Sequence, residues 1–154
     1  MIFLKGEVSI MSNWIQLDAQ RLDQTTHENQ NGVDIYFGLS PFDIPEAIRS
    51  HVDKSNDRLK IEFKYLDDPE EEKMEWSDKD SSLSVGKNSG CVYSISVNMK
   101  PLEEISGKSS LLKEFEDAVK GFIAEKHLTT VEESHYDVAR KALAEKAEEL
   151  LVIP

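Results

Sequence analysis

Cysteine, positive charge and long apolar runs are all scarce in this sequence, and each scarcity excludes a class of protein. Cys91 is the single cysteine among 154 residues, so neither a disulfide within the chain nor a multi-cysteine metal cage is possible. We therefore expect a cytoplasmic protein. No apolar run approaches the roughly 20 residues of a membrane-spanning helix, so we expect no contact with a membrane.

Positive charge is scarce because 18 Lys and Arg face 30 Asp and Glu, which gives a formal net charge of −12. This balance argues against direct binding of a nucleic-acid backbone, which needs clustered Lys and Arg, and against an anionic membrane surface. It permits a partner protein with a basic surface. With 39% apolar and 31% charged residues, the chain has a smaller apolar share and a larger charged share than an average globular domain. Its composition is nevertheless outside the disordered range.

The first ten residues have two interpretations. Lys5-Gly6-Glu7 can be encoded by AAA-GGA-GAG, which is typical of a bacterial ribosome-binding site and precedes Met11 at a suitable distance. Residues 1–10 are therefore either a translated leader of a bacterial protein or a short apolar first strand. We expect residues 11–154 to form one domain, with a sheet in residues 11–100 and helices in residues 109–151.

Alternation of apolar and polar residues predicts strands in the middle of the chain. The clearest is Arg58–Tyr65, in which Leu59, Ile61, Phe63 and Tyr65 face one side. Ser82–Met99 predicts a hairpin around a Gly86–Gly90 turn, with Tyr93, Ile95, Val97 and Met99 inward and Ser94, Ser96 and Asn98 outward. Shorter strands are expected in residues 14–19, 33–37 and 73–77, and a loop in residues 20–32.

Helix signals precede and follow these strands. Asp43, Pro45 and Glu46 are typical of a helix start and predict a short helix to about Val52. A capping box at Thr130 to Glu133 opens the second of two C-terminal helices. Their apolar stripes are Leu112, Phe115, Val119, Phe122 and Ile123, then Tyr136, Ala139, Leu143, Ala147 and Leu150. The order predicts an α+β fold, a single antiparallel sheet of about four to six strands with a two-helix C-terminal cover on one face.

Eight acidic residues gather between Asp67 and Asp80 against two lysines, so this segment carries half of the net charge. We interpret it as a docking surface for a basic partner. It is alternatively a solvated loop beside a sheet edge, or a divalent-cation site that lacks the usual loop glycine. The acidic residues are Asp67, Asp68, Glu70, Glu71, Glu72, Glu75, Asp78 and Asp80.

No motif demands catalysis, a metal or a cofactor, and we predict none of the three. Glu132 and His135 have the spacing of a di-iron carboxylate motif, but that site needs a second copy, which the sequence lacks. Cys91 follows a turn glycine without a local nucleophile signature, so we expect a half-buried structural thiol.

From Arg58 to Met99 the order is strand, acidic segment, strand, then the Gly86–Gly90 turn into Val92-Tyr-Ser-Ile-Ser-Val97. This arrangement resembles small bacterial β-rich domains of unknown function, whose last hairpin arm also follows a Gly turn. The resemblance implies a three-stranded meander and brings no activity or functional residues with it.

These patterns favour a non-enzymatic protein–protein interaction module with a regulatory or accessory role. The alternative is a small-ligand-binding protein or enzyme whose pocket lies between sheet and helices and uses Tyr36, Tyr65, Tyr93 and His135. A less favoured alternative is an acidic nucleic-acid mimic, because half of the charge imbalance sits in one short segment. The small residues of helix 131–151 also permit a homodimer.

Overall fold

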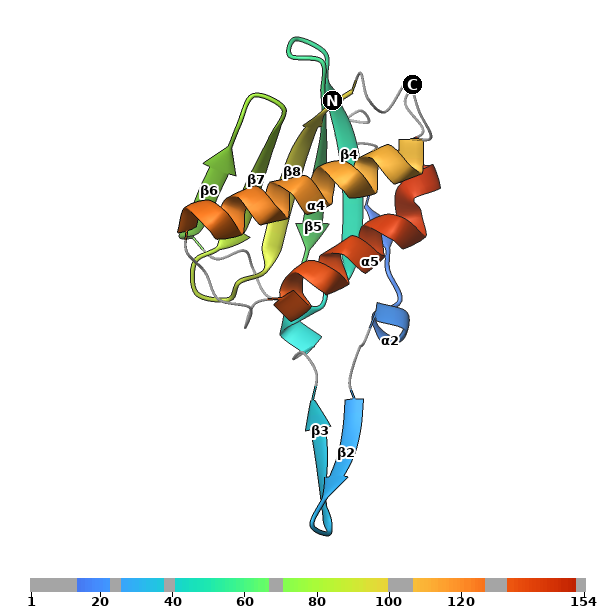
Figure 1. The fold of residues 1–154 in the computed structure, drawn as a ribbon. Coiled ribbons are helices and arrows are strands. Elements are labelled where there is room, and N and C mark those ends of the chain that lie inside the picture. The colour runs from blue at the N-terminus through green and yellow to red at the C-terminus, as the bar shows by residue number, and fades with distance from the viewer. Residues whose placement is uncertain are drawn as a thin grey trace.

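The computed structural model describes residues 14–22, 26–37, 41–66, 71–99, 107–126 and 133–151. Within these ranges six strands form one antiparallel sheet in the order β1-β4-β5-β8-β7-β6, and two more form a separate hairpin (Figure 1). The large sheet consists of β1 (Ile15–Gln16), β4 (Ala47–Asp53), β5 (Arg58–Lys64), β6 (Lys73–Ser77), β7 (Ser81–Gly86) and β8 (Val92–Asn98).

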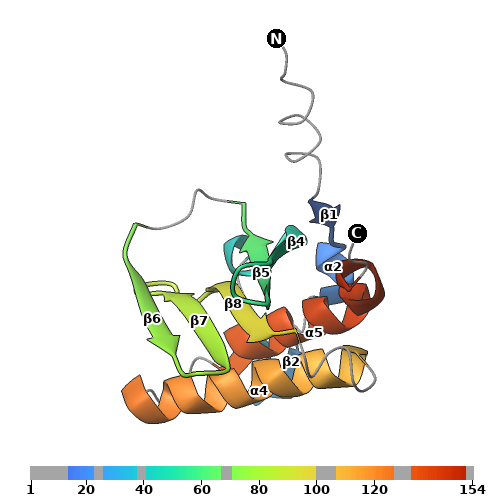
Figure 2. The ribbon, with the colours of Figure 1, turned by 90° about the horizontal axis from the view of Figure 1, so that it is seen from above.

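Two long helices, α4 (Gly107–Lys126) and α5 (Glu133–Leu150), lie side by side on one face of the sheet (Figure 2). This arrangement confirms the predicted α+β class and its two-helix cover. The remaining elements are short: α2 (Ala19–Leu22), β2 (Thr26–Gln30), β3 (Val33–Phe37) and the 3-10 helix η1 (Pro41–Asp43). No helix in the described part of the chain is long and apolar enough to cross a membrane.

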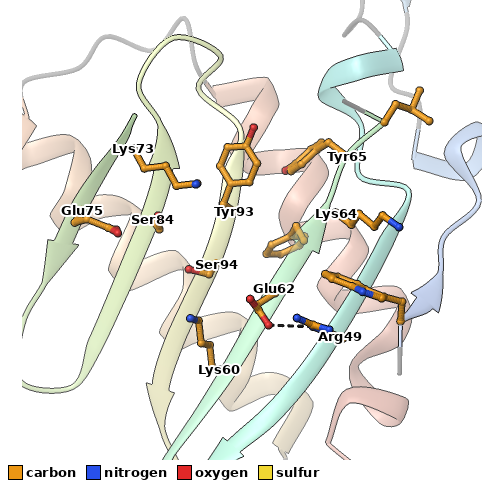
Figure 3. Close-up of a pocket in the computed structure, with 13 residues that line it drawn as sticks. Arg49, Lys60, Glu62, Lys64, Tyr65, Lys73, Glu75, Ser84, Tyr93 and Ser94 are labelled. Atoms are coloured by element: carbon orange, nitrogen blue, oxygen red, sulfur yellow. Dashed lines mark hydrogen bonds and ion pairs between the residues drawn. The ribbon is translucent and has the colours of Figure 1, made fainter. Parts of the chain in front are cut away.

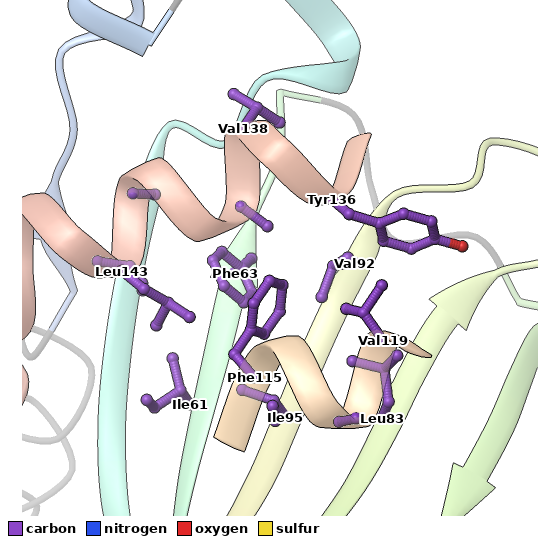
Figure 4. Close-up of a cluster of buried hydrophobic side chains, with 14 of the residues drawn as sticks. Ile61, Phe63, Leu83, Val92, Ile95, Phe115, Val119, Tyr136, Val138 and Leu143 are labelled. Atoms are coloured by element: carbon purple, nitrogen blue, oxygen red, sulfur yellow. The ribbon is translucent and has the colours of Figure 1, made fainter. Parts of the chain in front are cut away.

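The core lies between the sheet and the two helices, and β5 and β8 form its floor. Leu59 and Ile61 of β5 are opposite Val97 and Ile95 of β8, and all four side chains are buried. Phe115 of α4 packs over Ile61 and Ile95 (Figure 4). Each such side chain contributes about 1.5–3 kcal/mol by leaving water. The alternation in Arg58–Tyr65 is therefore confirmed as the signature of a strand with one buried face.

The predicted stripe of α5 is buried throughout. In α4 Phe115, Val119 and Phe122 are buried, whereas Leu112 and Ile123 are partly buried against the core. α4 begins at Gly107, two residues before the helical region predicted to start at residue 109. The predicted capping residue Thr130 lies outside the described residues. Arg140 of α5 donates to Glu116 of α4 at 2.6 Å and ties the helices together.

The C-terminal end of α5 is held by β4. The Ser50 hydroxyl donates to the Leu150 carbonyl at 2.7 Å. The last carbonyls of a helix have no partner inside the helix, so this bond satisfies one of them. It also explains why a polar residue is tolerated between Ile48 and Val52 on the covered face of β4.

The predicted helix from Pro45 to about Val52 is wrong, because Ala47–Asp53 forms strand β4. Ile48 and Val52 are β-branched and suit a strand, and β4 pairs with β5 along its whole length. Docking as a strand therefore gives this segment a full hydrogen-bond ladder, which outweighs the local helix signals at Pro45 and Glu46. Only η1 forms a helical turn there.

The predicted loop in residues 20–32 is also wrong in part. The chain forms α2 and then β2, which pairs with β3 around Asn31 and Gly32. Both turn residues have positive φ, 54° and 81°, as a two-residue hairpin turn requires. The β2–β3 hairpin projects away from the large sheet (Figure 1), and Val33 at the start of β3 is 59% exposed. The strand expected in residues 14–19 is reduced to β1, because Ala19 starts α2.

Residue 121 of α4 needs to be glycine because the Trp76 ring of β6 packs directly against the helix backbone there. A Cβ at residue 121 would overlap three atoms of that ring. We expect Gly121→Ala to lower the free energy of unfolding by about 1–2 kcal/mol, because overpacking outweighs the gain of up to ~1 kcal/mol in helix propensity. Urea denaturation measures the change.

The control for this prediction is the same substitution in a Trp76→Leu background. There the overlap is absent, so Gly121→Ala should stabilise the protein. Equal destabilisation in both backgrounds would contradict the proposed contact.

Candidate functional site

The face of the large sheet opposite the helices carries a hollow of about 540 Å³ (Figure 3). None of the described helices covers this face, which we call the open face (Figure 2). The hollow is lined by Trp14, Arg49, Lys60, Glu62, Phe63, Lys64, Tyr65, Leu66, Lys73, Glu75, Ser84, Tyr93 and Ser94. Outward residues of β4, β5, β6, β7 and β8 therefore contribute to one continuous surface.

Small side chains produce the hollow. Ser94 of β8 pairs with Ser84 of β7 and with Glu62 of β5, so short hydroxyls occupy the centre of the face. Longer side chains, such as Lys60 and Glu75, stand on either side. A second hollow of about 430 Å³ adjoins the first and shares Lys60, Glu75, Ser84 and Ser94 with it. The two together form a trough that runs across the strands.

A change of register turns Tyr93 toward this trough. Ser84 pairs with Ser94 but Val85 pairs with Val92, which leaves Tyr93 as an extra residue of β8. Such a bulge changes which residues face inward. Val92 is fully buried, and Tyr93 lines the hollow with Ser94 (Figure 3). The prediction that Tyr93 faces the core with Ile95 is therefore wrong, while Ile95, Val97 and Met99 are buried as expected.

Tyr65 anchors the bulge from the next strand. Its hydroxyl donates to the Val92 carbonyl at 2.7 Å. The centres of the Tyr65 and Tyr93 rings lie 5.3 Å apart, and the rings contact each other edge-on. Burial raises the pKa of Tyr65 well above its ordinary value, and the nearby Cys91, Tyr93 and Asp43 raise it further. The hydroxyl therefore remains a hydrogen-bond donor far into the alkaline range.

Cations dominate the sides of the trough, although the chain as a whole is acidic. Four Lys and Arg side chains and two carboxylates line the larger hollow. Arg49 donates to Glu62 at 3.0 Å and its guanidinium lies 4.2 Å from the centre of the Trp14 ring. The Lys73 ammonium lies 5.0 Å from the centre of the Tyr93 ring. These contacts place cations and aromatic rings together at both ends of the hollow.

The predicted acidic docking residues lie in several places. Asp67, Asp68 and Glu70 are outside the described residues. Asp78 accepts the backbone N–H groups of Asp80 and Ser81, both at 2.8 Å, and so builds the β6–β7 turn. Asp80 accepts from Asn98, and Glu72 pairs with Lys87 at 3.0 Å. Glu75 lies in the trough, and Glu71 is exposed.

The four predicted pocket residues divide into groups. Tyr65 and Tyr93 come together at the open face, whereas His135 of α5 lies beside Asp43. Tyr36 belongs to the projecting β2–β3 hairpin, and its side chain lies outside the described residues (Figure 1). The space between sheet and helices is filled by hydrophobic side chains (Figure 4).

A second cluster of polar side chains was not predicted from the sequence. Asp43 of η1, Cys91 next to β8 and His135 of α5 place a carboxylate, a thiol and an imidazole within 4.8 Å of one another. The Cys91 thiol donates to Asp43 Oδ1 at 3.4 Å, and His135 Nε2 lies 3.6 Å from Asp43 Oδ2. The three residues are far apart in the chain, so no local motif predicts that they come together. Glu132, the other half of the Glu-x-x-His motif, lies outside the described residues.

Comparisons of this chain with protein-family models, with curated proteins and with solved structures found no match. The resemblance of residues 58–99 to small bacterial β-rich domains is therefore not confirmed.

The hydrogen bond from Tyr65 to Val92 should contribute measurably to stability. Tyr65→Phe leaves the ring in place but removes the donor to a carbonyl in a buried segment. We expect the free energy of unfolding to fall by about 1–3 kcal/mol at neutral pH. Chemical denaturation measures this, and an unchanged stability would contradict the assigned bond.

The raised pKa of Tyr65 predicts a dependence of stability on alkaline pH. The unfolded chain loses the Tyr65 proton near the ordinary pKa of 10.0, whereas the folded chain keeps it. Stability is therefore fully present below pH 10 and falls above it. In Tyr65→Phe the fall should be shallower by up to about 1.4 kcal/mol per pH unit. Identical slopes for both proteins would show that Tyr65 titrates normally.

Proposed function

We propose that this chain is a protein–protein interaction module whose open face binds an extended, acidic segment of a partner protein. The observation that carries the proposal is the trough itself, with its hydroxyl floor and its excess of cations. Glu62 is already paired with Arg49 and Lys64 lies 3.9 Å from Glu46, so Lys60 supplies most of the charge that remains for a ligand. An acidic segment complements this surface, although the chain has a net charge of −12.

The form of the trough supports an extended occupant. It runs across β5, β8, β7 and β6, which at about 4.8 Å between strands spans about 15 Å, the length of roughly five extended residues. A small-molecule pocket is usually concave and mostly apolar, and it encloses most of its ligand. This trough is open, lies on an uncovered sheet and is about half polar, which favours a peptide segment over an enzyme substrate.

Individual side chains suit such a segment. Lys60 stands beside the serine floor in both hollows and forms no ion pair with another described residue. Ser84 and Ser94 offer hydroxyls that donate to carboxylates or backbone carbonyls. Trp14 and Tyr93 offer ring surface at the ends of the larger hollow, as is common at protein interfaces.

A basic partner remains a second candidate, and one observation favours it. Burial raises the pKa of Glu114 on α4, and Asp117, Asp80 and Asp78 add to the effect through their negative charge. The end of the acidic segment therefore adjoins further carboxylates of α4. A cationic partner would reduce the repulsion between these neighbouring carboxylates.

Two labelled peptides of equal length test the proposal, one alternating glutamate and serine and the other lysine and serine. We expect the acidic peptide to bind, with an affinity that falls as salt is raised. Replacing Lys60 and Lys73 by Ala should weaken binding about tenfold, since two exposed charge pairs contribute about 1.4 kcal/mol. Fluorescence anisotropy measures the affinity.

The matched control is the double substitution Lys113→Ala and Lys120→Ala, which removes the same charge from the exposed side of α4. It should leave binding of the acidic peptide unchanged. Equal weakening by both double variants would mean that the peptide senses only net charge. Binding of the basic peptide alone, lost on neutralising Glu70, Glu71 and Glu72, would favour the second candidate instead.

A further inference from the structure

We propose that Asp43, Cys91 and His135 form a zinc site with three protein ligands. The proposal is independent of the function proposed for the open face. The three residues come from three separate parts of the fold: η1, the segment leading into β8, and the first turns of α5. One ligand atom from each residue, the Cys91 sulfur, a ring nitrogen of His135 and a carboxylate oxygen of Asp43, nevertheless lies within 4.8 Å of the other two.

The distances between these atoms match those between ligands of one tetrahedral ion. Zn–S bonds of about 2.3 Å and Zn–N and Zn–O bonds of about 2.0–2.1 Å place S and O about 3.5 Å apart, and N and O about 3.4 Å apart. The observed distances are 3.4 Å from Cys91 Sγ to Asp43 Oδ1 and 3.6 Å from His135 Nε2 to the other carboxylate oxygen, Oδ2. Each distance is close to the value for two ligands of one ion, and a small rotation of the Asp43 carboxylate would bring one oxygen between the sulfur and the nitrogen.

The histidine provides a second, independent observation. Both ring nitrogens of His135 are buried, and neither has a hydrogen-bond partner among the described residues. A separation of 3.6 Å from Asp43 is too long for a hydrogen bond. Buried polar atoms without partners are rare in folded proteins, and a bound ion is one way in which such an atom is satisfied. Coordination through Nε2 satisfies one of the two nitrogens.

The donor set identifies the ion. Calcium and magnesium take oxygen ligands, whereas one thiolate, one imidazole and one carboxylate suit zinc. Binding requires the thiolate, so the proton that Cys91 shares with Asp43 leaves for solvent as the Zn–S bond forms. Three protein ligands leave the fourth position of a tetrahedral ion for water.

The same geometry argues against Cys91 as a nucleophile. Its thiol is 2% exposed and donates to a carboxylate rather than to the imidazole base. A nucleophilic cysteine needs access to substrate and a base within reach. An ion needs an opening only wide enough for itself and water, and it needs no base aligned for attack. When bound, it would tie η1 and the start of α5 to the sheet.

Cobalt(II) is the probe that tests the site most directly, in the untagged full chain. Cys91 is the only cysteine, so a sulfur-to-cobalt charge-transfer band can arise from no other residue. We expect one equivalent of cobalt to bind with this band and with the intense visible spectrum of tetrahedral coordination, and zinc to displace it. Absence of the band, or a weak octahedral spectrum, would overturn the proposal without any variant.

Variants then assign the remaining ligands. His135→Gln should weaken zinc binding about 100-fold or more, since even loss of an outer-shell partner costs up to about 100-fold. His51→Gln, at an exposed histidine of β4 that faces Glu62, is the matched control and should leave affinity unchanged. Thermal unfolding without metal checks that both variants fold, and zinc should raise the unfolding temperature of the control alone. Equal zinc affinity in both variants would exclude His135 as a ligand.

Discussion

The burial of one face of β5 and β8 is the constraint on which the rest of the molecule depends. Leu59, Ile61, Ile95 and Val97 lose their contact with water only because α4 and α5 cover them. The strict alternation of side chains then forces the polar partners of these residues onto the other face. The helices thus determine the open face as much as the core, since burial of one face of β5 and β8 turns their alternate residues toward the trough.

The trough exists because of two local departures from a regular sheet surface. Serines at the centre of β7 and β8 leave room that longer side chains would fill. The bulge at Tyr93 brings an aromatic ring to the same face and lets Tyr65 reach the Val92 carbonyl. The cost is an interrupted ladder between β7 and β8, which the buried Tyr65 hydroxyl offsets in part.

Much of the fold could be predicted from the sequence because it depends on neighbouring residues. The alternation in Arg58–Tyr65 and the stripes of α4 and α5 report burial directly. β4 could not be predicted, because its state depends on pairing with β5 rather than on Pro45 and Glu46. The β2–β3 hairpin did have a local signal, the Asn31-Gly32 pair, which is typical of two-residue hairpin turns.

The sites were harder to predict for the same reason. Tyr93 changes face because of a bulge, which no periodic pattern records. Asp43, Cys91 and His135 meet only after η1, β8 and α5 have docked, and no spacing in the sequence brings them together. The acidic segment was visible in the sequence, yet Asp78 and Asp80 turn out to make the hydrogen bonds of the β6–β7 turn.

The claim that the open face is the binding surface is tested most directly by mapping backbone amide chemical shifts while a glutamate–serine peptide is added. The account predicts changes concentrated at Lys60, Ser84, Ser94 and their neighbours across β5, β7 and β8, with α4 and α5 unaffected. Changes centred instead on Asp78, Asp80 and Glu114, or the absence of any localised change, would contradict it.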